Sequence, residues 1–85
     1  MVEFNVAADI KVYVDDASKM DIVKKEIEKL VKVQRFWEED VGFGIKALKA
    51  TLLLEDSEGG TEAVEEKIKA LSHVSQVEVE NVTRV

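Results

Sequence analysis

The chain has 85 residues, which is enough for one domain over residues 1–85 and too few for a two-domain enzyme. Hydrophobic residues make up 46% of the sequence and charged residues 35%, a composition typical of a globular protein. The 18 acidic residues outnumber the 12 basic ones, giving a net charge of −6. This charge disfavours direct binding to nucleic acid or to an anionic membrane surface.

Residue types that the sequence lacks exclude further classes of site. There is no cysteine, so disulfides, thiolate metal sites and thiol catalysis are excluded, and one histidine cannot form a multi-histidine metal site. No apolar run reaches transmembrane length, and the first ten residues lack the features of a signal peptide. We therefore expect a cytoplasmic protein with no cofactor, no metal and no membrane partner.

The first half of the chain predicts a strand, a helix and a second strand. Apolar residues alternate with polar ones over residues 4–14, which is typical of a half-buried strand. Residues 15–18 offer helix caps, and apolar residues at helical spacing follow from Met20 until about Lys32. Residues 33–41 predict a strand with Phe36 and Trp37 on opposite faces.

The second half predicts a turn, an interior strand, a second helix and a last strand. The turn is formed by residues 42–44, and the apolar density of residues 45–54 favours a central position in a sheet. After a loop at residues 55–60, Thr61 is expected to cap a helix that ends near Ser72. Val77 and its neighbours predict a final strand, with Arg84 beyond it.

The predicted order of elements is β-α-β-β-α-β. It indicates an α+β fold of the ferredoxin-like class, in which a four-stranded antiparallel sheet carries both helices on one face. This fold hosts many unrelated activities and by itself indicates none of them.

No constellation of residues indicates catalysis. His73 is expected in a turn, with no pair of orienting carboxylates at a useful spacing nearby, so a polar surface residue is favoured over a catalytic one. The acidic runs at residues 38–40 and 55–58 lack the ligand spacing of a calcium loop, and a solvated acidic face is favoured. The glycine pair before Thr61 lacks the lysine of a phosphate-binding loop. We therefore expect a protein that is not an enzyme.

Two residues have no evident structural purpose. Phe43 lies between two glycines at a turn, where it either projects as a protein-binding anchor or folds back over the sheet edge. Arg84 is an isolated basic residue next to the C-terminus, where a frayed and solvated end is the simpler interpretation.

These residues lie in segments that resemble a known family. The segment VGFGIKAL at residues 41–48 resembles the most characteristic motif of translation elongation factor 1 beta, the guanine nucleotide exchange factor for elongation factor 1 alpha. The segments at residues 55–62 and 77–85 also resemble that family, and the likeness to the archaeal form covers nearly the whole chain. One departure is that the chain has no proline before the aromatic turn.

The resemblance implies a single guanine nucleotide exchange domain over residues 1–85. It implies that Phe43 inserts into a pocket on the nucleotide-binding domain of the elongation factor 1 alpha GTPase. It also implies that Arg84, where relatives often have lysine, reaches toward the magnesium site of that GTPase. The expected interface further includes Gly42, Gly44, Lys46 and Val85.

Two points stay open. Lys46 and Lys49 follow the turn on one strand and are either interface residues or part of a solvated strand face. The alternative function is a ferredoxin-like regulatory module that binds a small ligand and dimerises through its sheet. The exchange-factor interpretation instead predicts a monomer whose partner is the GTPase.

Overall fold

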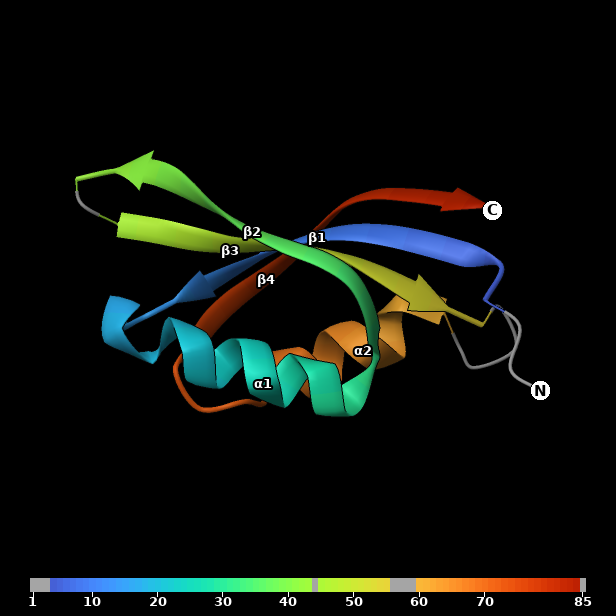
Figure 1. Cartoon of the computed structure of the whole chain (residues 1–85), viewed down its shortest axis with the longest axis horizontal. Coiled ribbons are helices and arrows are strands. Elements are labelled where there is room, and N and C mark those ends of the chain that lie inside the picture. The colour runs from blue at the N-terminus through green and yellow to red at the C-terminus, as the bar shows by residue number, and fades with distance from the viewer. Residues whose placement is uncertain (1–3, 44, 56–59, 85) are drawn as a thin grey trace.

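The computed structural model describes residues 4–43, 45–55 and 60–84. In chain order the elements are β1 (Val6–Val14), η1 (Ala17–Lys19), α1 (Met20–Leu30), β2 (Lys32–Gly42), β3 (Ile45–Leu54), α2 (Gly60–Lys69) and β4 (Val74–Arg84). The strands form one sheet in the order β2-β3-β1-β4, and each neighbouring pair is antiparallel. Both helices cover the same face of this sheet (Figure 1). The predicted ferredoxin-like α+β fold is confirmed.

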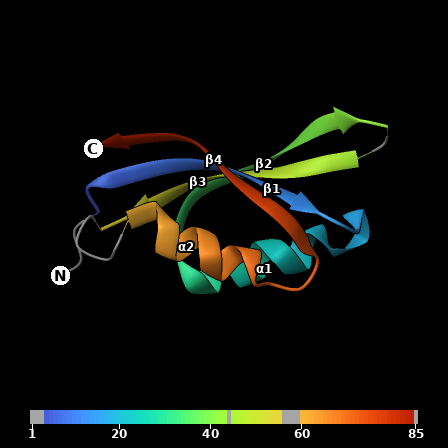
Figure 2. The same ribbon diagram turned by 180° about the vertical axis from the view of Figure 1, so that it is seen from behind.

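The core lies between the sheet and the two helices. On β1 every second residue from Val6 to Val14 is buried, as the alternation predicts. The predicted interior position of β3 is confirmed, and its buried residues interleave with those of β1. The rear view shows α2 packed under β4 with α1 beside it (Figure 2). The helices contribute fully buried side chains to the centre of the core: Val23 and Ile27 from α1, and Ile68 from α2.

The first connection follows the predicted capping. The carboxylate of Asp16 accepts hydrogen bonds from the backbone amide and hydroxyl of Ser18, at 3.0 and 2.7 Å. These bonds hold the short helix η1, which leads directly into α1. The predicted opposite orientation of Phe36 and Trp37 is also confirmed, because Phe36 packs against the core and Trp37 is exposed.

Three predicted boundaries are wrong. α2 begins at Gly60, so Thr61 lies inside the helix, and it ends at Lys69 because a turn follows in which Leu71 donates to the Ile68 carbonyl. β4 begins at Val74 and continues to Arg84, so Arg84 is not beyond the final strand. The whole length of β1 is available to pair with β4, and this pairing keeps the C-terminal residues extended.

Candidate functional site

The turn between β2 and β3 presents an aromatic side chain at one end of the molecule. Phe43 is fully exposed and has a φ of 56°, in the left-handed region that residues with a side chain seldom adopt. Gly42 before it has a φ of 99°, which favours glycine, although a side chain there would meet open space. The exposed alternative for Phe43 is therefore confirmed, and the alternative in which its ring folds over the sheet edge is wrong.

Behind this tip lies a small group of charges on the helix-covered side. The ammonium of Lys46 lies 3.9 Å from the carboxylate of Glu38, which is also 3.5 Å from the ammonium of Lys24 on α1. Half of the Lys46 side chain is exposed, so it remains available to a partner beside Phe43. Gly44, the other expected residue of the turn, lies outside the described residues.

The opposite end of the sheet carries Arg84. Arg84 is the last residue of β4, is exposed, and lies opposite Val6 on β1. Val82 lies opposite Ala8 on the same face and is 51% exposed, which makes it a large apolar side chain next to Arg84. Val82 was not predicted as a site residue, because the alternation of apolar and polar residues is lost after Glu80. Val85 lies outside the described residues.

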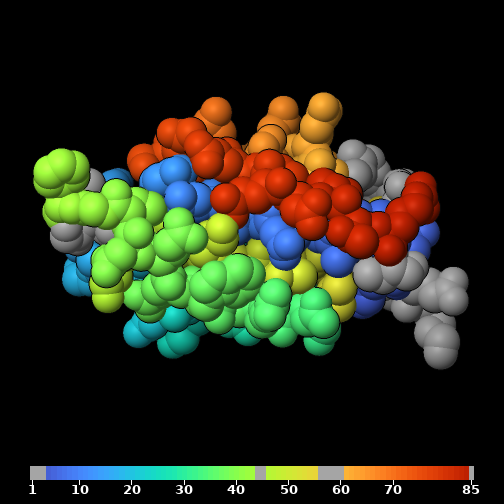
Figure 3. Space-filling model, turned by 90° about the horizontal axis from the view of Figure 1, so that it is seen from above, coloured from blue at the N-terminus to red at the C-terminus, as the bar shows by residue number. Residues whose placement is uncertain are grey.

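The two ends are far apart. Arg84 pairs with Val6, and Val6 pairs with Leu54 at the end of β3. The ten residues of β3 run from Ile45 at the tip to Leu54, and nine steps of about 3.3 Å give roughly 30 Å. Figures 1 and 3 show the tip and the C-terminal end of β4 at opposite ends of a molecule whose longest extent is 41 Å. The structure therefore does not bring Phe43 and Arg84 together.

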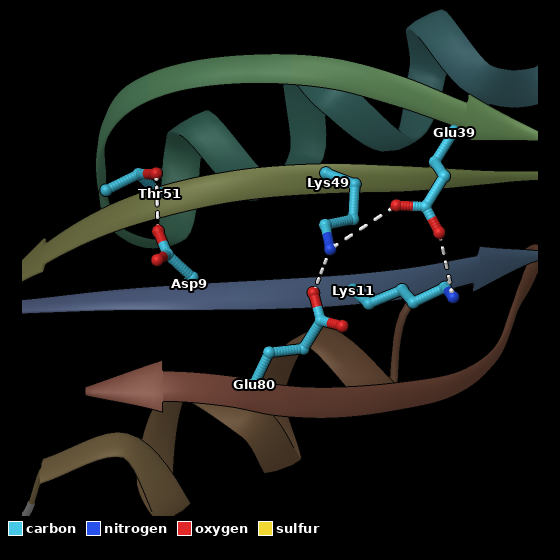
Figure 4. Close-up of polar contacts among 6 residues, drawn as sticks. All are labelled: Asp9, Lys11, Glu39, Lys49, Thr51 and Glu80. Atoms are coloured by element: carbon cyan, nitrogen blue, oxygen red, sulfur yellow. Dashed lines mark hydrogen bonds and ion pairs between the residues drawn. The ribbon is translucent and has the colours of Figure 1, made fainter.

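The face of the sheet that the helices leave uncovered carries an ionic cluster, formed by Lys11, Glu39, Lys49 and Glu80 (Figure 4). The carboxylate of Glu39 lies 3.2 Å from the ammonium of Lys11 and 3.6 Å from that of Lys49. The ammonium of Lys49 also donates a hydrogen bond to Glu80. The ionic cluster thus contains one residue from each of the four strands.

The pKa values of the ionic cluster shift as these contacts require. The hydrogen bond from Lys11, with the charges of both lysines, holds the pKa of Glu39 below its usual range. The hydrogen bond to Glu80 raises the pKa of Lys49, and the bond to Glu39 raises that of Lys11. All these shifts favour the charged forms.

Lys46 and Lys49 follow the turn on one strand but face opposite sides of the sheet. Lys46 meets Glu38 on the helix-covered side, whereas the Lys49 side chain is 12% exposed within the ionic cluster on the other side. Glu38 and Glu39 are separated in the same way, so the first acidic run does not converge on one point. Among the described residues, no three acidic, histidine or cysteine side chains are grouped to hold a metal ion.

Other polar side chains of the uncovered face are also paired with one another. The guanidinium of Arg35 lies 4.8 Å from the ring centre of Trp37, and the hydroxyl of Thr51 donates to the carboxylate of Asp9 at 2.7 Å.

His73 lies in the predicted turn, with its Nδ1 3.5 Å from Asp15. Over the described residues, neither helix is long and apolar enough to cross a membrane.

These features define a small α+β module whose exposed aromatic and basic residues lie at opposite ends of its sheet. The family model described as EF-1 guanine nucleotide exchange domain matches residues 5–85. The chain belongs to this family. The resemblance found in the sequence is thereby confirmed.

Archaeal relatives support the same assignment. Elongation factor 1-beta of Aeropyrum pernix is 42% identical over 86 residues, which cover 94% of this chain and 96% of the relative. Elongation factor 1-beta of Methanosphaera stadtmanae is 36% identical, with 95% of this chain and 97% of the relative covered. That of Methanocella arvoryzae is 40% identical, with coverage of 89% and 91%.

Similar solved structures support the fold alone. The ACT domain from GTP pyrophosphokinase of Chlorobium tepidum, solved by NMR, superposes with a TM-score of 0.67 at 14% identity, covering 88% of this chain and 85% of that domain. The C-terminal domain of the MgtC protein from Mycobacterium tuberculosis gives a TM-score of 0.60 at 13% identity, covering 100% of this chain and 93% of that domain. At this identity the likeness carries no function.

Proposed function

We propose that this chain is a guanine nucleotide exchange factor that promotes GDP release from elongation factor 1 alpha during translation elongation. Its family and the names of its relatives support exchange as the activity. The observation that carries the proposal is the fully exposed ring of Phe43, held outward on a left-handed turn. The factor works as a monomer in the cytoplasm and has no bond chemistry of its own.

Phe43 supplies docking energy. An aromatic ring that is exposed in the free protein and buried in a pocket of a partner contributes about 2 kcal/mol or more to binding. The left-handed turn holds the ring outward before the partner arrives, so little ordering is needed on docking. Lys46 borders the tip and adds a charged contact at its rim.

Arg84 disturbs the magnesium site of the GTPase. A guanidinium brought next to a magnesium ion repels the ion and competes for its carboxylate and water ligands. Loss of the ion exposes the charge of the nucleotide phosphates to the surrounding acidic groups and weakens GDP binding. Arg84 at the end of an edge strand, with Val82 exposed beside it, has the access that this role requires.

The spacing of the two residues assigns them to two contact sites. With roughly 30 Å between the ends of the sheet, Phe43 and Arg84 cannot enter one pocket. The GTPase must therefore offer an aromatic pocket at one end and its magnesium site near the other. The sheet between the two sites serves as a spacer of fixed length.

Exchange then follows from differential affinity. A factor shifts an equilibrium only if it binds one state of its partner more tightly than the other. Here the favoured state is the nucleotide-free GTPase, in which Arg84 does not compete with a bound ion. Phe43 contributes to the affinity for both states, whereas Arg84 contributes to the difference between them.

Separate measurements of affinity and rate test this division. We expect Arg84→Ala to lower the maximal rate of GDP release from elongation factor 1 alpha much more than it weakens the complex with the nucleotide-free GTPase. Phe43→Ala should weaken the complex itself. An unchanged release rate in the Arg84→Ala variant would overturn the role given to that residue.

A small-ligand regulatory module has less support. The likeness to the ACT domain extends to the fold alone at 14% identity. Such a module would dimerise and would gain thermal stability with its ligand. A monomer that responds to the GTPase and to no small ligand is the result expected from an exchange factor.

A further inference from the structure

The edge strand β4 contains two residues more than β1, with which it pairs: Ser75 near its start and Glu80 nearer its end. Asp9 pairs with Asn81 and Ile10 pairs with Val79, so Glu80 is an extra residue between two consecutive pairs. An extra residue of this kind is a β-bulge, which bends its strand and changes the direction of the side chains that follow.

The bulge decides on which face of the sheet Arg84 lies. Residues directly opposite each other in an antiparallel pair point to the same face. Val82 lies opposite Ala8 and Arg84 opposite Val6, and both β1 residues are buried under the helices. If β4 were regular after Val79, every later residue would move by one position, and Thr83 would take the place of Arg84 opposite Val6. Arg84 would then point to the uncovered face.

A single side chain holds the bulge residue from the neighbouring strands. Lys49 on β3 reaches across β1, and its ammonium binds the carboxylate of Glu80 on β4 (Figure 4). Its position is fixed on the other side by Glu39 on β2, at 3.6 Å. The Lys49 side chain is 12% exposed and that of Glu80 is 37% exposed, so solvent reaches this contact from the Glu80 side.

We propose that Lys49 is a positioning residue for exchange: by holding Glu80 in the bulge, it sets the register of the end of β4 and keeps Arg84 on the helix-covered side. The inference rests on the proposed function, in which Arg84 acts on the GTPase. Without the lysine, the Glu80 carboxylate stays on a face that also carries Glu39 and Asp9, and the bulge loses its partner. The strand then shifts toward regular pairing, which relieves the interrupted ladder.

The register of β4 against β1 can be measured by NMR on the protein alone, without the GTPase. In the wild-type chain, cross-strand nuclear Overhauser contacts should connect Ala8 with Val82. In Lys49→Met, we expect Ala8 to contact Asn81 instead, in all or a large part of the molecules. Lys11→Met is the matched control, because Lys11 is 14% exposed in the same ionic cluster and pairs with Glu39 at 3.2 Å rather than with the bulge residue. It should retain the wild-type register.

Exchange assays with a rescue variant separate positioning from simple destabilisation. We expect Lys49→Met to lower the maximal GDP release rate about tenfold or more, because a misplaced functional group loses most of its effect. Lys11→Met should stay within about twofold of wild type. Deletion of Glu80 in the Lys49→Met background should restore exchange. The shortened strand places Arg84 opposite Val6 with no bulge to maintain. Simple destabilisation predicts that this second change adds damage.

The outcomes of these experiments distinguish failure of the inference about Lys49 from failure of the proposed function. If Lys49→Met keeps the contact between Ala8 and Val82, or if deletion of Glu80 fails to restore exchange, the inference is overturned. If the register shifts but Arg84→Ala has normal exchange, the proposed function has failed and the register assignment stands. Should Lys49→Met not fold by circular dichroism, Glu80→Gln removes the same charge pair at constant size and is read by the same contacts.

Discussion

Replacing Phe43 separates partner binding from folding, because its ring makes no contribution to the core. The ring is fully exposed, so Phe43→Ala should change the free energy of unfolding by no more than about 0.5 kcal/mol. A phenylalanine buries about 200 Å² at an interface, which at about 25 cal/mol per Å² sets a ceiling near 5 kcal/mol. A hot-spot residue contributes about 2 kcal/mol or more. We therefore expect the exchange efficiency to fall about thirtyfold or more.

The assay is GDP release from elongation factor 1 alpha, measured beside urea unfolding of each variant. Phe43→Gly is a second variant, which should unfold at higher urea concentration than Phe43→Ala but should be equally poor in GDP release. A residue with a side chain at a φ of 56° destabilises the folded state by about 1–2 kcal/mol. Glycine avoids this cost, but its greater flexibility in the unfolded chain offsets about 0.5–1 kcal/mol of the gain. Phe43→Gly should thus be more stable than Phe43→Ala by about 0.5–1 kcal/mol and equally poor in exchange. Normal exchange in either variant, or a loss that follows stability, would refute the reasoning.

Three further predictions concern stability and residues outside the contact sites. Ile68→Ala removes a fully buried side chain and should cost about 2–5 kcal/mol in the free energy of urea unfolding; a smaller loss would mean that this side chain is not central to the core. The folded-state pKa of Glu39 is lowered, so its contribution to stability is present above about pH 4.3 and is lost as the pH falls through the lower folded value. Urea unfolding of Glu39→Gln should therefore show a weaker loss of stability on acidification than the wild-type chain, and parallel profiles would contradict this. His73→Asn should leave exchange and stability unchanged, because asparagine tolerates the φ of 72° at this turn; a large loss of exchange would give His73 a role that the structure does not indicate.

Most of the fold follows from the periodicity of the sequence. The strict alternation of β1 and the apolar density of β3 predict an outer layer of polar side chains and an interior strand, and both are observed. The end of β4 could not be predicted in the same way. Because Glu80 is an extra residue, two polar residues, Glu80 and Asn81, follow each other, and the alternation is lost there although the strand remains paired with β1. The bulge at Glu80 therefore explains why the last strand was predicted to end before Arg84.

The sequence indicates which residues are candidates for contact with the GTPase, but not how their side chains are oriented or how far apart they lie. The glycines around Phe43 indicate a turn, but the sequence left open whether its ring projects or folds back, and the full exposure of the ring in the structure decides this. The distance between Phe43 and Arg84 depends on the pairing of β1 with both β3 and β4, which is a property of the sheet order. Lys49 has no local signal, because its partners Glu39 and Glu80 are brought to it only by the folded sheet.

The most direct test of the account is the rate at which fluorescent GDP leaves purified elongation factor 1 alpha at physiological magnesium, with this protein present in substoichiometric amounts. We expect release to accelerate strongly and each molecule of the factor to act on many molecules of the GTPase. Release at the unassisted rate from a cognate GTPase would contradict the assignment of exchange activity to this chain.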